Sequence, residues 1–121
     1  MKNYTPHAVT IYKEDGITVV TEIPPEKHSY RLKEDRIPME GSRCGIPWVS
    51  PAKYVNLEPA PTLDDRQSII IVSQFVAQWI QENNHSLFFK EVYAPDTGPT
   101  GMVRDQRTGK ILGVKRLIKY I

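Results

Sequence analysis

The stretch YAPDTGPTGMVRDQRTGKILGVKRLI, at positions 93–118, decides how the rest of the chain is organised. Its first part, the loop 95–101 (PDTGPTG), mixes prolines and glycines with Asp96, Thr97 and Thr100, and Arg104 follows closely. Proline fixes the backbone dihedral angles and glycine frees them, so a loop this rich in both is predicted to hold one shape. A shaped loop beside cationic and hydroxyl donors is what an anionic small-molecule site requires. No nucleophile–base pair accompanies it.

The residues on either side of this loop predict β-strands. Residues 87–93, just before it, are rich in aromatic and β-branched side chains and predict one strand. Residues 101–104 and 111–118 predict a hairpin whose turn spans 105–109 and contains Thr108-Gly109. The loop is therefore expected to join two strand segments.

Residues 68–82 predict a strand that passes into a helix almost without a loop. Residues 68–72 (SIIIV) form an apolar, β-branched run that is typical of a strand buried on both faces. The apolar positions 75, 76, 79 and 80 then repeat at helical spacing, with Ser73 as the N-cap. Residues 83–85 (NNH) provide an end to the helix.

The N-terminal half predicts a hairpin followed by less regular structure. Residues 4–23 contain two β-branched runs, 8–12 and 17–23, which are joined by a turn that ends in Asp-Gly. Residues 29–33 alternate and predict a third strand. Residues 34–60 are interrupted by prolines and glycines and are expected to be irregular, with short strands at 46–49 and 54–57 as candidates. Together these elements predict an α+β fold, an antiparallel sheet with one main helix packed against it.

Size and composition limit the class of protein. A chain of 121 residues is long enough for one domain, taken as residues 1–121, and too short for two ordinary ones. Apolar residues make up 40% and charged residues 25%, as in ordinary globular proteins. The single cysteine, Cys44, excludes an intramolecular disulfide. Because no long apolar run is present, we expect a cytoplasmic protein with no membrane contact.

The positive charge is concentrated at the C-terminal end. The net charge is only +2. From residue 104 onward one acid, Asp105, stands against six basic residues: Arg104, Arg107, Lys110, Lys115, Arg116 and Lys119. Such a distribution indicates a local anion-binding face and not the extended coating that DNA binding would need. For Lys115 and Lys119 a solvated strand face is at least as good an interpretation.

Histidines and paired carboxylates give no strong catalytic motif. His7, His28 and His85 are too scattered for the metal-hydrolase motifs, and no cofactor or metal is predicted. The pair Asp64-Asp65, followed by a basic residue, is typical of a solvated turn. Asp96 beside Thr97 and Gly98 favours an Asx-turn over an acid–base pair with Asp105. The same triplet is similar to the D-T/S-G of aspartic proteases, but those proteins carry it in the first third of the chain.

Several side chains have two open interpretations. Arg104 is placed to reach a phosphate bidentately, or to pair with Asp105 or Asp96 and tie the loop to the hairpin. Phe75 and Trp79 lie one helical turn apart, which is typical of core, yet an aromatic face there also suits a purine. Asn83 and Asn84 either read base edges and ribose hydroxyls or simply end the helix.

Two segments carry a resemblance to a family. Residues 3–12 (NYTPHAVTIY) resemble the N-L-T-P-H-x-V-x-I start of many small phage proteins, and the segment from APDTGPT through VRD to GKILGV resembles their end. Between them, the Pro-Pro turn, the Tyr30-Arg31 strand and the strand-to-helix step occur in the same order. Over most of its length the chain is similar to the phage anti-Thoeris sponges, which capture cyclic ADP-ribose signals.

The resemblance implies a non-enzymatic, homo-oligomeric sponge that holds the glycocyclic ADP-ribose made by a bacterial TIR enzyme, with pockets where protomers meet. Some members also hold cyclic oligonucleotides at separate sites. By position, the ligand-binding candidates are Phe75, Trp79, Asn83, Asn84, Asp96, Thr97, Arg104, Arg107 and Arg31. Two other functions stay open: a virion or host-takeover module that binds another protein and no nucleotide, and a small dimeric hydrolase that uses Asp96.

Overall fold

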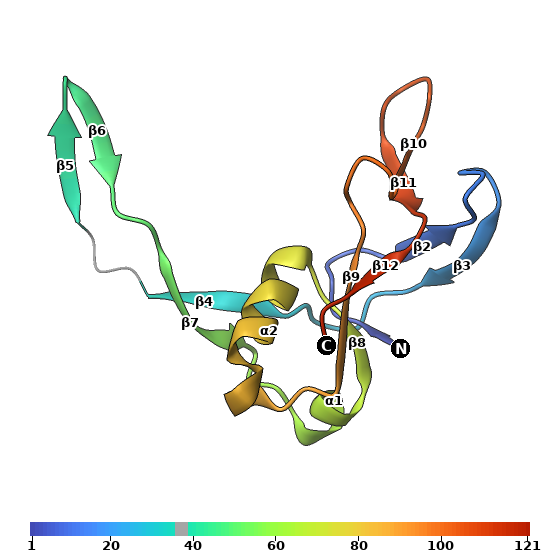
Figure 1. Cartoon of the computed structure of the whole chain (residues 1–121), viewed down its shortest axis with the longest axis horizontal. Coiled ribbons are helices and arrows are strands. Elements are labelled where there is room, and N and C mark those ends of the chain that lie inside the picture. The colour runs from blue at the N-terminus through green and yellow to red at the C-terminus, as the bar shows by residue number, and fades with distance from the viewer. Residues whose placement is uncertain (36–38) are drawn as a thin grey trace.

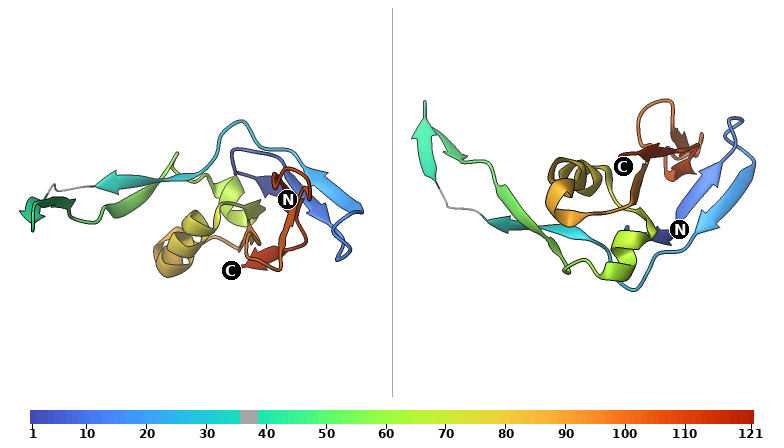
Figure 2. Two further views of the ribbon diagram at one scale, coloured as in Figure 1. Left: turned by 90° about the horizontal axis from the view of Figure 1, so that it is seen from above. Right: turned by 60° about the horizontal axis from the view of Figure 1, so that its bottom comes forward.

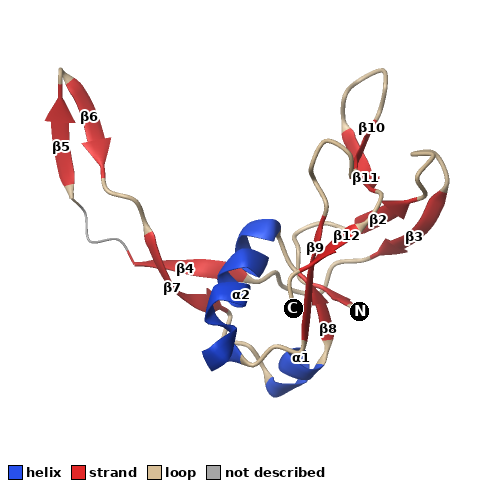
Figure 3. Ribbon diagram, in the orientation of Figure 1, coloured by secondary structure: helices blue, strands red, loops and turns tan. Residues whose placement is uncertain are grey.

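The computed structural model describes residues 1–35 and 39–121 and confirms the α+β class, with one main helix beside strands (Figures 1 and 3). Two four-stranded sheets have the orders β1-β8-β9-β12 and β10-β11-β2-β3, and two further pairs are β4-β7 and β5-β6. The elements are β1 (Lys2–Asn3), β2 (Val9–Tyr12), β3 (Val19–Ile23), β4 (Arg31–Asp35), β5 (Glu40–Arg43), β6 (Ile46–Val49), β7 (Lys53–Glu58), α1 (Leu63–Gln67), β8 (Ile69–Ile71), α2 (Gln74–Leu87), β9 (Glu91–Pro95), β10 (Met102–Arg104), β11 (Ile111–Val114) and β12 (Leu117–Lys119).

An antiparallel sheet was predicted, but the sheet beside helix α2 contains both parallel and antiparallel pairs. Strand β8 pairs in parallel with β1 and with β9, whereas β12 pairs with β9 antiparallel. The reason is the path of the chain. Because α2 carries it back along the sheet between β8 and β9, β9 starts at the same end as β8 and must run parallel to it.

Helix α2 is longer than predicted, and the strand after it begins later. The expected N-cap is confirmed: the Ser73 hydroxyl accepts from the Val76 amide. At the other end Phe88 adopts the left-handed conformation (φ 61°), and the Asn84 side-chain oxygen accepts from the Phe89 amide at 2.8 Å. A left-handed cap of this kind ends a helix. Residues 87–90 therefore belong to the helix end and a turn, and the predicted strand 87–93 is found at 91–95.

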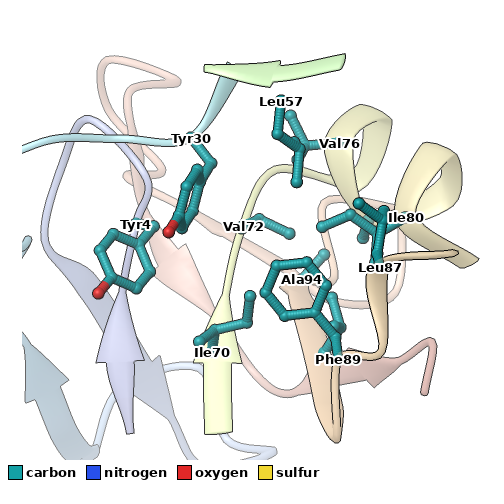
Figure 4. Packing of buried hydrophobic residues seen from close by; sticks show 12 residues of the cluster. Tyr4, Tyr30, Leu57, Ile70, Val72, Val76, Ile80, Leu87, Phe89 and Ala94 are labelled. Atoms are coloured by element: carbon teal, nitrogen blue, oxygen red, sulfur yellow. The ribbon is translucent and has the colours of Figure 1, made fainter. Parts of the chain in front are cut away.

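The main hydrophobic core lies between α2, the first sheet and the root of the β4–β7 pair (Figure 4). Ile70, Val72, Ile80 and Val92 have no exposed surface. The run 69–71 is buried as expected at positions 70 and 71, although Ile69 at its start is 39% exposed. Apolar burial at about 25 cal/mol per Å² makes these side chains the main source of stability.

The C-terminal strand segment divides between the two sheets. We predicted one strand over 111–118; instead β11 pairs with β10 and β2, and β12 pairs with β9. The break falls at Lys115-Arg116, where the Lys115 amide donates to the Gly101 carbonyl at 2.7 Å. Gly113 permits the close approach of β11 to β2, because a Cβ there would overlap the Thr10 carbonyl oxygen. The predicted hairpins of β2 with β3 and of β10 with β11 are confirmed.

Residues predicted to be irregular form a projecting β arm instead. Strand β4 pairs with β7, and β5 pairs with β6 at the far end from the body (Figures 1 and 2). The candidate strands at 46–49 and 54–57 are confirmed, and the predicted strand 29–33 is found at 31–35. Cys44 and Gly45 both have positive φ values, 53° and 76°, which suits a two-residue hairpin turn. Part of the predicted irregular region, residues 36–38, lies outside the described residues.

The interpretation of Asp64-Asp65 as a solvated turn is wrong for Asp65, because both residues lie in a short helix and only Asp64 is exposed. Thr62 caps the short helix α1, and Asp65 is only 3% exposed. The Asp65 carboxylate accepts from the hydroxyls of Tyr4 and Tyr30, and the Lys2 ammonium lies 3.2 Å away. A buried carboxylate needs such partners to offset its loss of water. None of the described helices is long and apolar enough to cross a membrane.

Candidate ligand-binding site

The loop 95–101 is held in one shape by hydrogen bonds of its own side chains and of Arg116. Asp96 Oδ1 accepts from the Gly98 amide at 3.0 Å, which confirms the Asx-turn. Its Oδ2 accepts from Arg116 Nε at 2.9 Å, and Arg116 Nη2 donates to Thr100 Oγ1 at 2.7 Å. The prediction of a rigid loop therefore has a physical basis. Arg116 was missed as its organiser, although its position in the middle of the apolar run 111–118 is a usable signal.

Gln74 ties this loop to the first turn of α2. Its side-chain amide donates to the Pro95 carbonyl and to Thr97 Oγ1, each at 3.0 Å. Gln74 was not among the predicted ligand-binding residues. Because one donor group reaches two acceptors, the loop and the helix start form a continuous wall.

Beside this wall lies a cavity of about 610 Å³, which we call the main cavity. Strands β2 and β11 supply its apolar surface, through side chains that include Val9, Ile111 and Leu112. Ile111 and Leu112 remain 53% and 42% exposed, so an apolar ligand here would cover surface that water now contacts. Seven of the lining residues have polar side chains: Thr5, His7, Thr10, Ser73, Gln74, Thr97 and Lys110.

The electrostatics of the main cavity favour an anion. Among the described residues that line it, Lys110 is cationic and none carries a carboxylate. The N-terminus of α2 contributes positive potential, since the amides of its first turn have no intrahelical acceptor. The Val76 amide donates to the Ser73 hydroxyl. The amides of Gln74 and Phe75 lie before that of Val76, at the N-terminal end of the helix. His7 completes the rim, held by hydrogen bonds to its carbonyl from Asn3 and Thr5.

Only one of the sequence-predicted ligand residues, Thr97, lines the main cavity. Asp96, next to it, is turned into the loop and its side chain is 15% exposed. Asn83 donates to the Trp79 carbonyl at 2.9 Å, and Asn84 bonds both the amide and the carbonyl of Phe89. Asn84 therefore helps to end the helix, as the simpler of the two interpretations held, whereas Asn83 is bonded within the helix.

The remaining candidates lie at three other places. Arg104 and Arg107 line a second cavity of about 450 Å³ between the turn that follows β2 and the turn that follows β10. Arg104 Nη1 donates to the Gly109 carbonyl at 2.9 Å, a contact neither of its interpretations anticipated. Phe75 and Trp79 line a crevice beside β7, and Arg31, 80% exposed, lies 3.8 Å from Glu58. The structure thus does not gather the predicted residues into one pocket.

The described residues form no metal site, and Asp96 and Asp105 do not form a carboxylate pair. No three His, Cys, Asp or Glu side chains within 1–35 and 39–121 gather closely enough to hold a metal ion. Asp105 accepts from the amides of Arg107 and Thr108, so it forms its own turn. Asp96 and Asp105 are each engaged in separate turns and do not form an acid–base arrangement.

Comparisons of the chain with protein-family models, with curated proteins and with solved structures give no match.

Proposed function

We propose that the protein binds a small anionic nucleotide of the cyclic ADP-ribose class, such as glycocyclic ADP-ribose, and sequesters it without cleaving it. The observation that carries the proposal is the main cavity. It combines apolar walls, a lysine and a helix N-terminus, and the described residues that line it include no carboxylate. Its volume of about 610 Å³ lies within the range of about 300–1,000 Å³ typical of small-molecule sites.

Each part of such a ligand has a matching part of the cavity. The partly exposed side chains of Ile111 and Leu112 provide apolar surface that adenine would cover. Lys110 and the start of α2 suit a pyrophosphate, because backbone amides and the helix dipole both stabilise phosphate groups. Hydroxyls of Thr5 and Thr97 suit ribose.

Binding without turnover is consistent with how these polar groups are used. The Ser73 hydroxyl serves as the helix cap, and the Thr5 hydroxyl donates to its own neighbours. The wall made by Gln74, Thr97 and the Arg116–Asp96 pair is already ordered. A preformed wall reduces the ordering cost of binding, and high affinity is what stoichiometric capture needs.

The second cavity, which shares Leu112 with the main cavity, supports a further part of the proposal, a second site for the phosphates of an anion such as a cyclic oligonucleotide. Arg104, Arg107 and Lys115 line it. The two acids present, Asp15 and Asp105, are engaged with backbone amides of their own turns. The three cations therefore outweigh them toward a ligand.

We also propose that the protein acts as a homo-oligomer, and the β arm supports this part. In the register of β5 and β6, Gly41 faces Trp48 and Arg43 faces Ile46, so Trp48 and Ile46 lie on one face of the hairpin. They are 46% and 67% exposed. A two-stranded hairpin is marginal in water by itself. A second copy of the chain would cover its apolar face.

The same arm favours the alternative function, a phage protein-interaction module with no nucleotide ligand. In that case another protein, and not a second copy, covers Trp48 and Ile46. Calorimetry of the purified protein against glycocyclic ADP-ribose separates the two, with recovery of the ligand by heating and its mass measured afterwards. Intact ligand, bound near one per chain, supports the sponge; cleaved ligand indicates an enzyme; no binding favours the interaction module.

A further inference from the structure

A separate crevice of about 260 Å³ lies where the outer side of α2 meets the β4–β7 pair. Three aromatic side chains line it, together with one carboxylate: Tyr54, Phe75, Trp79 and Glu82. Leu32 and Gln78 complete the lining. We call it the aromatic crevice. It does not share a lining residue with the main cavity, so it is independent of the proposed nucleotide site.

The rings in the aromatic crevice form a corner. Tyr54 and Phe75 have centroids 5.0 Å apart and planes at 82°, so the two rings stand nearly at right angles. Trp79 follows Phe75 by one helical turn on the same side of α2, which the fixed helical spacing requires. Phe75 is 56% exposed, whereas Tyr54 and Trp79 are half-buried. The three rings and Glu82 together line the crevice, so a compact group held there would contact aromatic surface from both α2 and β7.

The charge of the residues that line the aromatic crevice is negative. Glu82 is the charged residue among them. Lys53 is adjacent to Tyr54 in β7, and strand alternation directs it to the opposite face. No lysine or arginine is among the described residues that line the crevice. Because carboxylates repel phosphate, this lining disfavours the pyrophosphate of the nucleotide that sequence reasoning assigned to Phe75 and Trp79.

We propose that the aromatic crevice binds an organic cation of side-chain size, an alkylammonium or guanidinium group. Cations are attracted to the faces of Trp, Tyr and Phe rings, and quaternary ammonium groups are recognised by rings in this manner. The crevice volume suits such a group and is below that of sites for whole nucleotides. Glu82, which lines the crevice, supplies the complementary charge.

The test is fluorescence of Trp79 in a Trp48→Phe background, which leaves Trp79 as the sole indole because the chain has two tryptophans. Choline is titrated against 3,3-dimethylbutan-1-ol, which has the same shape without the charge. Nα-acetyl-arginine amide tests a cation presented as a protein side chain would present it. We expect saturable binding of the two cations, and binding of the neutral alcohol weaker by about fivefold or more.

Substitutions in α2 test whether choline binds at the aromatic crevice. Glu82→Gln should weaken choline binding by about threefold, and Phe75→Ala should weaken it further. The matched control is Phe88→Ala, at the other end of α2, which removes an exposed ring outside the crevice (71% exposed, against 56% for Phe75) and should leave binding unchanged. Equal binding of choline and the alcohol, no saturable response to either cation, or full binding by Phe75→Ala would each overturn the proposal. Binding of choline without the arginine derivative would restrict the ligand to free alkylammonium compounds and retain it.

Discussion

Arg116 and Asp96 meet across 20 residues of sequence, with the guanidinium Nε 2.9 Å from the carboxylate Oδ2. The same guanidinium reaches Thr100, so a single side chain holds both ends of the loop 95–101. This loop forms part of the wall of the main cavity through Thr97, which Gln74 holds in place. The pair is thus a link between the fold and the proposed binding site.

We predict that Arg116→Ala leaves the protein folded and weakens its ligand binding. Loss of the partly exposed ion pair and the Thr100 bond should lower the free energy of unfolding by about 1 kcal/mol, measured by urea denaturation. Affinity for glycocyclic ADP-ribose should fall by about tenfold, because the wall must then be ordered on binding. Lys27→Ala, which removes an exposed cation outside both cavities, is the control. Unchanged affinity in Arg116→Ala would contradict the role of the loop.

Gly113→Ala should destabilise the protein strongly. An added Cβ would overlap the Thr10 carbonyl oxygen, and backbone atoms cannot move aside as a flexible side chain can. The expected loss is about 2–3 kcal/mol in the free energy of unfolding, seen by thermal or urea denaturation. Gly98→Ala serves for comparison, since its Cβ would meet only the Asp96 carboxylate oxygen at 3.2 Å, and it should cost less. Equal stability of the Gly113 variant and the wild type would mean that β2 and β11 are not packed so closely.

Stability should depend on pH through Asp65. Burial raises the pKa of this carboxyl, but hydrogen bonds from Tyr30 and Tyr4 and the Lys2 ammonium lower it more, so it lies below its ordinary value of 3.8. A carboxyl whose pKa is lower in the folded state than in the unfolded state stabilises the protein at pH values above the unfolded-state pKa. This stabilisation is lost as the pH falls through the folded-state pKa. The free energy of unfolding should therefore decrease as the pH is lowered from about 5 to below 4.

Asp65→Asn tests this account. It should lower the free energy of unfolding at pH 7 by about 3 kcal/mol, because Lys2 and the two hydroxyls lose their charged acceptor. It should also flatten the loss of stability in acid. Asp64→Asn, whose side chain is 79% exposed, is the neighbouring control and should have a small effect. If the two variants had the same stability and pH profile, the buried network would not have the role assigned to it.

The β arm predicts a face-specific effect on assembly. Ile46 and Val49 are similarly exposed, at 67% and 59%, yet the register of β5 and β6 places them on opposite faces of the hairpin. Ile46→Ser should shift the protein toward monomers in sedimentation velocity, since it places a polar side chain on the apolar face that Ile46 forms with Trp48. Val49→Ser should not. A wild type that sediments as a monomer at all concentrations would contradict the proposed homo-oligomer.

Local patterns predicted much of the fold. The β2–β3 hairpin, the β8-to-α2 step and the Ser73 cap follow from alternation, helical spacing and a hydroxyl at the right position. What local patterns could not reveal is pairing between distant segments. The parallel pairing of β8 with β9, and the division of residues 111–118 between two sheets, depend on tertiary contacts that have no short-range signature.

The candidate site, too, could be predicted only where it depends on local sequence. Asp96 and Thr97 were correctly placed in a shaped loop, because proline, glycine and Asx-turn chemistry act locally. Asp65 was misassigned because a buried carboxylate and a solvated one look alike until Tyr4 and Tyr30 are brought to it from elsewhere in the chain. Gln74 and Lys110 were missed as lining residues for the same reason: the cavity is made by elements that meet only in the folded protein.

The central claim is tested most directly by calorimetry of glycocyclic ADP-ribose with the wild type, Lys110→Gln and the control Lys27→Gln. The account predicts tight binding near one ligand per chain, intact ligand on release, and an affinity reduced by about threefold to tenfold in Lys110→Gln alone. No heat of binding at micromolar protein, or equal affinity in all three proteins, would contradict the assignment of the main cavity as the nucleotide site.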